Sequence, residues 1–115
     1  FFCYLCGMIS VCMATYNGER YIKEQVSSIL QQLGEMDELV VSDDGSTDST
    51  LQVLASFQDP RIKVFYGPRT GLTYNFENAI KNASGDYIFL SDQDDVWEPN
   101  KVECMVKLEL IHYDF

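Results

Sequence analysis

The chain has 115 residues, of which 46% are hydrophobic and 23% are charged, and its formal net charge is −10 at pH 7. This size and composition fit one small globular domain. The charge argues against nucleic acid as a partner, because no basic stripe is available to neutralise phosphates. A polyanionic ligand would need a bound cation as intermediary, or locally clustered Lys and Arg. No apolar run approaches the roughly 20 residues that a membrane-spanning helix requires.

Four cysteines stand at positions 3, 6, 12 and 104. The first two have a redox-type spacing, but they lie in an apolar leader without a second cysteine pair or a histidine nearby. Reduced cysteines in a cytoplasmic protein are therefore the favoured interpretation. Residues 1–7 precede Met8 and are expected to lie upstream of the domain, which covers residues 8–115.

The first half of the chain predicts two strands and two helices. Residues 9–14 read as a buried strand, and a loop of residues 15–18 ends it. The next helix places five apolar residues on one face: Ile22, Val26, Ile29, Leu30 and Leu33. Gly34 stops this helix. Residues 38–42 are the second expected strand, and the last residues of the loop 43–48 can cap a helix that carries Leu51, Leu54 and Phe57.

The second half continues the alternation. Residues 61–66 alternate like a half-exposed strand, and residues 67–71 form a loop. The helix after it is expected to bury Phe76, Ala79, Ile80 and Ala83 and to end at Gly85. Residues 87–91 are the fourth strand, and Pro99 opens a last helix. Strands that alternate with helices predict a three-layer α/β/α fold with a mostly parallel sheet.

Polar residues gather directly after each expected strand. Thr15-Tyr16-Asn17 follow the first, Asp43-Asp44 the second, Arg69 the third and Asp92-Gln93-Asp94-Asp95 the fourth. A parallel sheet brings these loops to one edge, where ligands of such folds bind. The converging carboxylates would repel one another unless a cation or a hydrogen-bonding ligand compensated them.

The acidic segment is the strongest of these signals. Mg²⁺ and Mn²⁺ prefer oxygen ligands and accept one or two protein carboxylates, which Asp92 and Asp94 could supply. A phosphate-bound ion would also meet the constraint set by the negative net charge. The alternative is a solvated acidic turn, or a cap for the helix that begins near Pro99.

The loop after the second strand has two compatible interpretations. As a turn, Asp44 would bond to the local backbone and Gly45 would supply an unusual φ. As a binding loop, Asp43 would accept from the imide N–H of uracil or thymine, and Asp44 from ribose or metal-bound water. Tyr16 is expected either at the edge of the core or as a flat surface for the base. Arg69 would pair with the diphosphate or the base edge, unless it is a solvated loop residue.

Three segments together resemble family 2 glycosyltransferases of the GT-A fold, in which the strand order is 3-2-1-4. They are residues 9–18 (ISVCMATYNG), 40–47 (VVSDDGST) and 85–99 (GDYIFLSDQDDVWEP). The resemblance runs from about residue 8 to the end of the chain. Its third segment is most similar to bacterial enzymes that build surface polysaccharides, including rhamnosyltransferases.

The resemblance implies inverting transfer of a sugar from a UDP- or dTDP-sugar to an acceptor hydroxyl, with Mg²⁺ or Mn²⁺ as cofactor. Asp92 and Asp94 would hold the metal, with Asp95 assisting from beside them. The implied donor-binding residues are Thr15, Tyr16, Asn17, Glu19, Asp43, Asp44, Arg69, Asp92 and Gln93.

The resemblance also implies that different parts of the protein bind the donor and activate the acceptor. The general base that deprotonates the acceptor is expected beyond Phe115, so the chain would supply donor and metal binding only. The acceptor is expected to be a saccharide or a lipid-linked saccharide, met in the cytoplasm at the inner face of the membrane. Apolar surface meant for the acceptor half would favour self-association of this chain.

Two rival functions remain at this point. A nucleotidyltransferase of similar fold would carry a glycine-rich, basic loop after the first strand, whereas residues 14–20 read ATYNGER. A non-catalytic acidic-pocket domain, such as a receiver-like module, would need a phosphoacceptor Asp after the third strand, where Tyr66 and Gly67 stand.

Overall fold

The computed structural model of the chain describes residues 7–92 and 97–99. Within them, strands and helices alternate along the chain. The strands are β1 (Ile9–Thr15), β2 (Glu38–Asp43), β3 (Ile62–Tyr66) and β4 (Tyr87–Asp92). The helices are α1 (Ile22–Leu30), α2 (Thr50–Ser56) and α3 (Leu72–Lys81). The helix expected after Pro99 lies outside the described residues.

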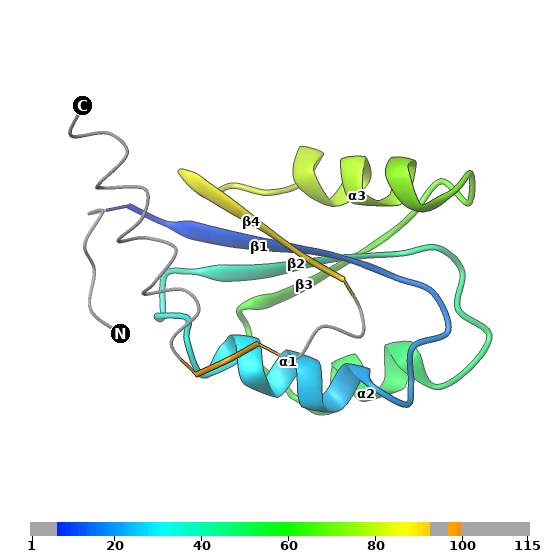
Figure 1. The fold of residues 1–115 in the computed structure, drawn as a ribbon, viewed down its shortest axis with the longest axis horizontal. Coiled ribbons are helices and arrows are strands. Elements are labelled where there is room, and N and C mark those ends of the chain that lie inside the picture. The colour runs from blue at the N-terminus through cyan, green and yellow to red at the C-terminus, as the bar shows by residue number, and fades with distance from the viewer. Residues whose placement is uncertain (1–6, 93–96, 100–115) are drawn as a thin grey trace.

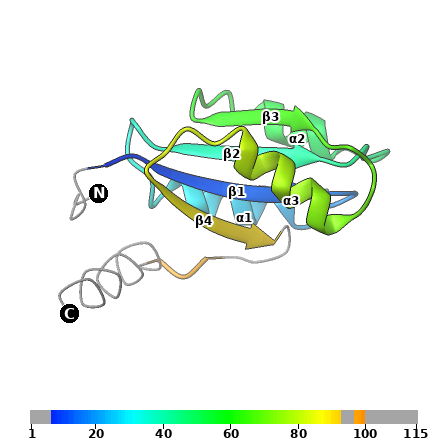
Figure 2. The same ribbon diagram turned by 90° about the horizontal axis from the view of Figure 1, so that it is seen from above.

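The described strands form one sheet in the order β3-β2-β1-β4. Each neighbouring pair runs parallel. Helices α1 and α2 cover one face of the sheet and α3 covers the other (Figure 1), and Figure 2 shows α3 lying over the middle of the sheet. The predicted three-layer fold and strand order are therefore confirmed.

The core lies on both sides of β1 and β2, whose residues are all buried. Because helices cover both faces, these strands are continuous apolar runs rather than alternating ones. The larger cluster fills the space under α1 and α2 and includes Val11, Met13, Ile22, Val26, Ile29, Leu54 and Trp97. Trp97 is 3% exposed, so this large ring is part of the core.

The smaller cluster, under α3, consists of Cys12, Val40 and Ala79. Burial raises the pKa of the Cys12 thiol to about 11, and the charge of Glu38 adds to the rise. The thiol therefore stays protonated, which suits a structural cysteine rather than a reactive one.

Two expectations about the helices are wrong. Helix α1 ends at Leu30 and α3 at Lys81, so Gly34 and Gly85 follow short turns instead of ending the helices directly. Ile80 is exposed, and Phe76 and Ala83 are only partly buried. The reason is that α3 turns Ala79 and the polar Asn75 toward the sheet, where Asn75 finds hydrogen-bond partners.

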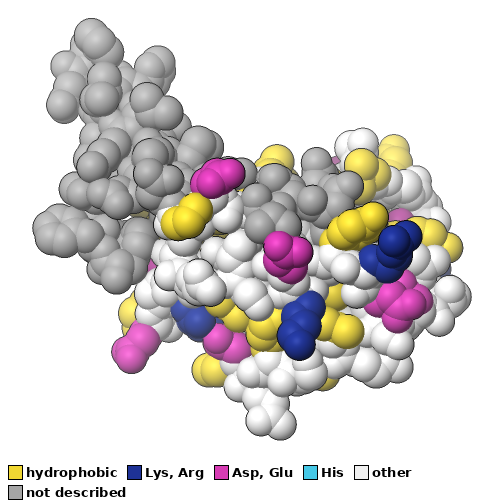
Figure 3. Space-filling model, turned by 60° about the horizontal axis from the view of Figure 1, so that its bottom comes forward, with side chains coloured by type: hydrophobic (Ala, Val, Ile, Leu, Met, Phe, Trp, Pro, Cys, Tyr) yellow, Lys and Arg dark blue, Asp and Glu magenta, His cyan; other side chains and the backbone are white. Residues whose placement is uncertain are grey.

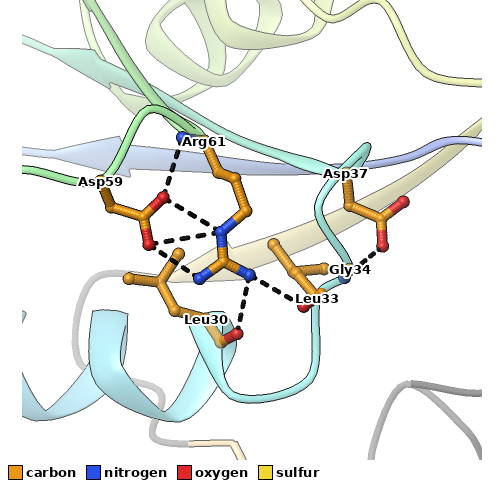
Figure 4. Close-up of polar contacts among 6 residues, drawn as sticks. All are labelled: Leu30, Leu33, Gly34, Asp37, Asp59 and Arg61. Carbon is orange, nitrogen blue, oxygen red and sulfur yellow. Dashed lines mark hydrogen bonds and ion pairs between the residues drawn. The ribbon is translucent and has the colours of Figure 1, made fainter.

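Arg61 ties the end of α1 to the start of β3 (Figure 4). Its Nη1 donates to the carbonyl oxygens of Leu30, at 3.1 Å, and Leu33, at 2.8 Å. Its Nη2 forms an ion pair of 2.7 Å with the carboxylate of Asp59. The guanidinium thus satisfies carbonyls that the last turn of a helix leaves without partners. The hydrogen bond from Arg61 is also the main cause that lowers the pKa of Asp59.

Replacement of Arg61 by Met should lower the free energy of unfolding by about 2 kcal/mol, because two carbonyls and a carboxylate lose a charged donor. Urea denaturation measures the effect. Arg20→Met is the matched control, since Arg20 is exposed and, within the described part of the chain, its guanidinium group lies over the ring of Tyr21. Equal losses in the two variants would show that the Arg61 contacts add no stability.

Glu38 joins three strands at the opposite end of the sheet from the predicted site. Its Oε2 accepts from Ser10 Oγ at 2.6 Å and from the Ser84 N–H at 2.7 Å, and its Oε1 accepts from Lys63 Nζ at 2.9 Å. Burial alone would raise the pKa of Glu38, but these hydrogen bonds and the Lys63 charge outweigh it, so the pKa is lowered. The carboxylate therefore remains an anion in the folded chain.

A lowered folded-state pKa makes this contribution depend on pH in a definite direction. The stabilisation is present above about pH 4.5, the ordinary pKa of Glu, and is lost as the pH falls through the lower pKa of the folded chain. Glu38→Gln should therefore cost about 2 kcal/mol at pH 7 and progressively less below pH 4.5. Denaturation curves from pH 7 to pH 3 test this against Glu77→Gln, an exposed control on α3. A pH-independent cost would contradict the role of the Glu38 charge.

Charged side chains of both signs lie on the surface. On the face shown in Figure 3, Lys and Arg side chains stand singly among acidic ones and form no basic patch. None of the described helices is long and apolar enough to cross a bilayer. Ile88 and Leu90 are exposed on β4, so this strand presents apolar side chains to solvent.

Candidate functional site

The parallel register brings the carboxyl ends of the strands together, as predicted. Thr15 pairs with Asp43, Asp43 pairs with Tyr66, and Asp92 pairs with Ala14 on the other side of β1. The loops after β1, β2 and β3 therefore meet at one edge of the sheet, which we call the carboxyl edge. The side chain of Asp92, and all of Gln93, Asp94 and Asp95, lie outside the described residues.

Asp43 holds the loop after β2 in shape. The residue is 1% exposed. Its Oδ1 accepts from Thr15 Oγ1 at 2.7 Å and from Ser46 Oγ at 2.6 Å, while Oδ2 accepts from the N–H groups of Gly45 and Ser46. Its acceptor positions are thus occupied by the chain itself. The turn-forming role expected for Asp44 belongs to Asp43.

Asp44 is the more accessible of the two carboxylates. Its backbone N–H donates to Thr15 O at 2.9 Å, and its Oδ1 accepts from the Arg69 N–H at 2.6 Å. Among the described residues, no hydrogen bond reaches Oδ2 of Asp44, which leaves one carboxylate oxygen available. Sequence reasoning could not separate the two adjacent acids, because both positions are acidic and follow the same strand.

Arg69 lies against the loop of Asp44. The residue has a φ of 61°, and Gly45 has a φ of 89°, as the turn prediction required. A Cβ added to Gly45 would come within 2.7 Å of Arg69 Nε, so the guanidinium group lies directly over the glycine backbone. Glycine at this position therefore serves both the turn and the close approach of the cation.

Asn17 and Glu19 join the loops after β1 and β2. Asn17 has a φ of 50°, its N–H donates to Ser46 Oγ at 2.8 Å, and its Oδ1 accepts from the Thr47 N–H at 2.8 Å. Glu19 Oε2 accepts from the Ser49 N–H at 3.0 Å. The two side chains expected to bind substrate thus also fix one loop to the other. Tyr16, between them and Thr15, is 55% exposed at the carboxyl edge.

Asn75 is a residue of this edge that the sequence analysis missed. It is buried on α3, where its Oδ1 accepts from Ser42 Oγ at 2.6 Å and its Nδ2 donates to Thr15 O at 3.3 Å. Asn78 adds bonds to Ser42 Oγ and Tyr66 O. Two Asn residues on the sheet-facing side of an otherwise apolar stripe were the available signal, because buried amides require partners.

The sequence matches the model of a known family, described as "Glycosyl transferase family 2", over residues 10–108. This range contains every residue placed at the carboxyl edge above and the acidic segment after β4. The chain belongs to glycosyl transferase family 2. The sequence resemblance is thereby confirmed, and the match favours the glycosyltransferase interpretation over a nucleotidyltransferase or a receiver-like domain.

Two bacterial relatives of the chain are named glycosyltransferases. The chain is 36% identical over 104 residues to the Escherichia coli protein named "UDP-Glc:alpha-D-GlcNAc-diphosphoundecaprenol beta-1,3-glucosyltransferase WfgD", covering 90% of this chain and 41% of that protein. It is 38% identical over 110 residues to the dTDP-rhamnosyl transferase RfbG of Shigella flexneri, covering 82% of this chain and 37% of RfbG. The chain thus spans less than half the length of these relatives.

A solved structure agrees with the fold. The S. aureus TarS 1–349 structure in complex with UDP-GlcNAc superposes with a TM-score of 0.81 at 29% sequence identity. The superposition covers 91% of this chain and 32% of TarS 1–349. The family 2 chain therefore has the GT-A fold that its sequence predicted, over nearly all of its length.

No metal-binding group of three or more acidic, His or Cys residues occurs among residues 7–92 and 97–99. The predicted ligand Asp94 is outside that range, and for Asp92 only the backbone is described. Since β4 pairs with β1 as far as Ala14, the backbone of Asp92 ends at the same edge as Thr15. The described chain therefore enters the acidic segment from this edge.

Proposed function

We propose that this chain binds the nucleoside diphosphate of a UDP- or dTDP-sugar at the carboxyl edge. The protein would transfer the sugar, with inversion, to a hydroxyl of a saccharide or lipid-linked saccharide during bacterial surface polysaccharide synthesis. The names of WfgD and RfbG support a UDP- or dTDP-linked donor. The diphosphoundecaprenol acceptor in the name of WfgD supports a lipid-linked acceptor, met at the inner face of the membrane.

The observation that carries this proposal is that the carboxylates of Asp43 and Asp44 make different contacts. Asp43 is saturated and builds the loop, so that Asp44 presents a carboxylate oxygen beside Arg69. A pyrimidine imide N–H needs an acceptor, and the flat, exposed ring of Tyr16 provides a stacking surface within the neighbouring loop. We therefore assign direct base or ribose contact to Asp44 and a shaping role to Asp43, with the Thr15 hydroxyl holding Asp43.

The diphosphate requires positive charge nearby, and this acidic chain offers few cationic side chains. Arg69, over Gly45, is one source. We propose that Asp92 and Asp94 hold Mg²⁺ or Mn²⁺ as a second source, with Asp95 and Gln93 beside them. When bound, such an ion neutralises charge on the diphosphate and thereby favours its departure from the sugar.

A thermal-shift screen tests the proposal. UDP-glucose, dTDP-rhamnose and GDP-mannose are each added with Mn²⁺, and the melting temperature Tm is recorded. The first two should raise Tm by several degrees at 1 mM, because a ligand that binds only the folded chain stabilises it, and the guanine nucleotide should raise it less. A shift with none of the three, or an equal shift with all of them, would contradict pyrimidine-nucleotide recognition.

A further inference from the structure

The side chain of Asn75 lies where the carboxyl ends of β1, β2 and β3 meet. Helix α3 begins after β3 and runs back over the sheet to the start of β4, so its first turns lie near the carboxyl edge (Figure 2). Asn75 points toward the sheet from these turns and is 2% exposed. The other buried residue of α3 is Ala79. The helix therefore places one buried amide under the edge where the loops meet.

The amide of Asn75 joins the ends of β1 and β2. Its Nδ2 donates to Thr15 O at 3.3 Å, and its Oδ1 accepts from Ser42 Oγ at 2.6 Å. Thr15 O also accepts from the Asp44 N–H at 2.9 Å. Both amide bonds thus act on the chain next to Asp44, one through the carbonyl that Asp44 shares and one through β2.

Asn78 fixes the direction of the bond between Ser42 and Asn75. Its Nδ2 donates to Ser42 Oγ at 2.9 Å and to Tyr66 O at 3.1 Å. Since the Ser42 oxygen accepts from Asn78, its hydrogen is free to be donated to Asn75 Oδ1. The Asn75 amide therefore keeps one orientation, with Nδ2 toward the end of β1.

Gly67, directly after β3, lies against both Asn75 and Asp44. Its N–H donates to Asp43 O at 2.7 Å. A Cβ added to Gly67 would overlap Oδ1 of Asn75 and would lie 2.7 Å from Oδ1 of Asp44. The helix side chain and the loop side chain therefore pack against the same point of the backbone, and Asn75 contacts the end of the third strand by packing.

Burial alone does not require an amide at position 75. Leucine has nearly the same shape as asparagine, and it has no polar atoms that need partners in the core. The polar atoms of Asn75 bond to the ends of two strands, each of which continues into a loop of the carboxyl edge. The amide thus fixes how far apart these two loops begin.

We propose that Asn75 is a positioning residue for recognition of the nucleotide base. Asp43 gives the loop after β2 its shape, whereas Asn75 sets the place of that loop, and of Asp44, relative to Thr15 and Tyr16. This inference rests on the proposed function, because it requires that Asp44 contacts the pyrimidine of a bound nucleotide. Asn75 is buried and acts through Asp44.

The test measures nucleotide selectivity and stability separately in Asn75→Leu and in the double variant Ser42→Ala/Asn75→Leu. Calorimetric titrations with UDP and with GDP, at one Mn²⁺ concentration, give two Kd values for each variant. Because the two nucleotides share the ribose and the diphosphate, the ratio of these Kd values reports recognition of the base. Urea denaturation gives the free energy of unfolding.

Asn75→Leu should bind UDP about tenfold more weakly, because the charged acceptor Asp44 is displaced rather than removed, and GDP binding should change little. The variant should also lose stability, since Ser42 Oγ keeps its hydrogen without the acceptor on α3. The double variant removes both partners of that bond and should recover most of the lost stability. Its UDP complex should remain weak, because α3 still has no donor for Thr15 O.

The matched control is Asn82→Leu, the same exchange at the other end of α3. Asn82 follows the last residue of the helix, and its Nδ2 donates to Asn78 O at 2.8 Å. It lies away from the carboxyl edge, so the Kd values of UDP and GDP should not change in this variant, whatever happens to its stability.

The outcomes separate the inference from the function it rests on. If the unmodified chain prefers UDP and the double variant recovers UDP affinity together with stability, Asn75 is a structural residue only, and the proposed function stands. Equal weakening of UDP and GDP in the double variant would also overturn the inference, because it indicates damage to the whole edge. If the unmodified chain shows no preference for UDP, both the inference and the proposed function are wrong.

Discussion

Asp94→Asn should weaken Mn²⁺-dependent binding of UDP or dTDP at least 100-fold while leaving the fold intact. The neutral amide offers one weaker oxygen ligand in place of a carboxylate, and hard divalent ions depend on anionic oxygen. Calorimetric titration of UDP with Mn²⁺ and with EDTA measures the effect. In EDTA, the variant and the unmodified chain should bind UDP equally weakly.

The matched control for this change is Asp86→Asn. Asp86 is also an exposed acid next to β4, but it stands at the opposite end of the strand and accepts from the Met8 N–H at 2.9 Å. Its replacement should not alter the metal dependence. Full cation-dependent affinity in Asp94→Asn would remove Asp94 from the metal site.

Asp43→Asn should mainly lower stability, whereas Asp44→Asn should mainly lower selectivity for pyrimidine nucleotides. In Asp43, Oδ2 accepts from two N–H groups and Oδ1 accepts from two hydroxyls. Asp43→Asn replaces one of these oxygens by an NH₂ group, which donates instead of accepting. The free energy of unfolding should therefore fall by about 3 kcal/mol, and binding of UDP and GDP should weaken together as the loop loses its shape. Asp44→Asn should change stability little, because among the described residues its side chain accepts one hydrogen bond, from the Arg69 N–H at Oδ1.

Nucleotide selectivity is the informative readout for Asp44. Loss of a charged acceptor for the pyrimidine or ribose costs about 1.5–3 kcal/mol, which corresponds to a 10- to 150-fold weaker UDP complex. The weak binding of GDP should change much less. If instead Asp43→Asn alone lost UDP selectively, with full stability, the direct contact would belong to Asp43, as the sequence first suggested.

The fold was accessible from the sequence because its signals are periodic. Residues 9–14 form an apolar run, and Ile22, Val26 and Ile29 recur at helical spacing. Both patterns indicate which residues are buried, and the structure buries them. The positive φ of Gly45 was also predicted correctly, since few residues other than glycine adopt a left-handed turn.

The division of roles within the site could not be predicted in the same way. Which of two adjacent acids turns inward depends on side chains distant in sequence, here Thr15 against Asp43 and Arg69 against Asp44. In the sequence, Asn75 only interrupts the apolar pattern of a helix. Its role depends on Ser42, which lies far away in the sequence and donates to Asn75 Oδ1 in the folded chain. The predicted burial of Ile80 was wrong for a related reason, because apolar periodicity does not show which residues of an apolar helix face the sheet covers.

The proposed ion gives the most direct test of the central claim, that a nucleotide and a divalent ion bind together at the carboxyl edge. In an amide NMR spectrum, bound Mn²⁺ broadens signals from residues near it. With UDP present, the signals of Tyr16, Asp44 and Arg69 should broaden, while those of Glu38, Arg61 and Gly85, at the other end of the strands, should stay sharp. Broadening centred on the latter group, or none beyond that caused by free Mn²⁺, would contradict the claim.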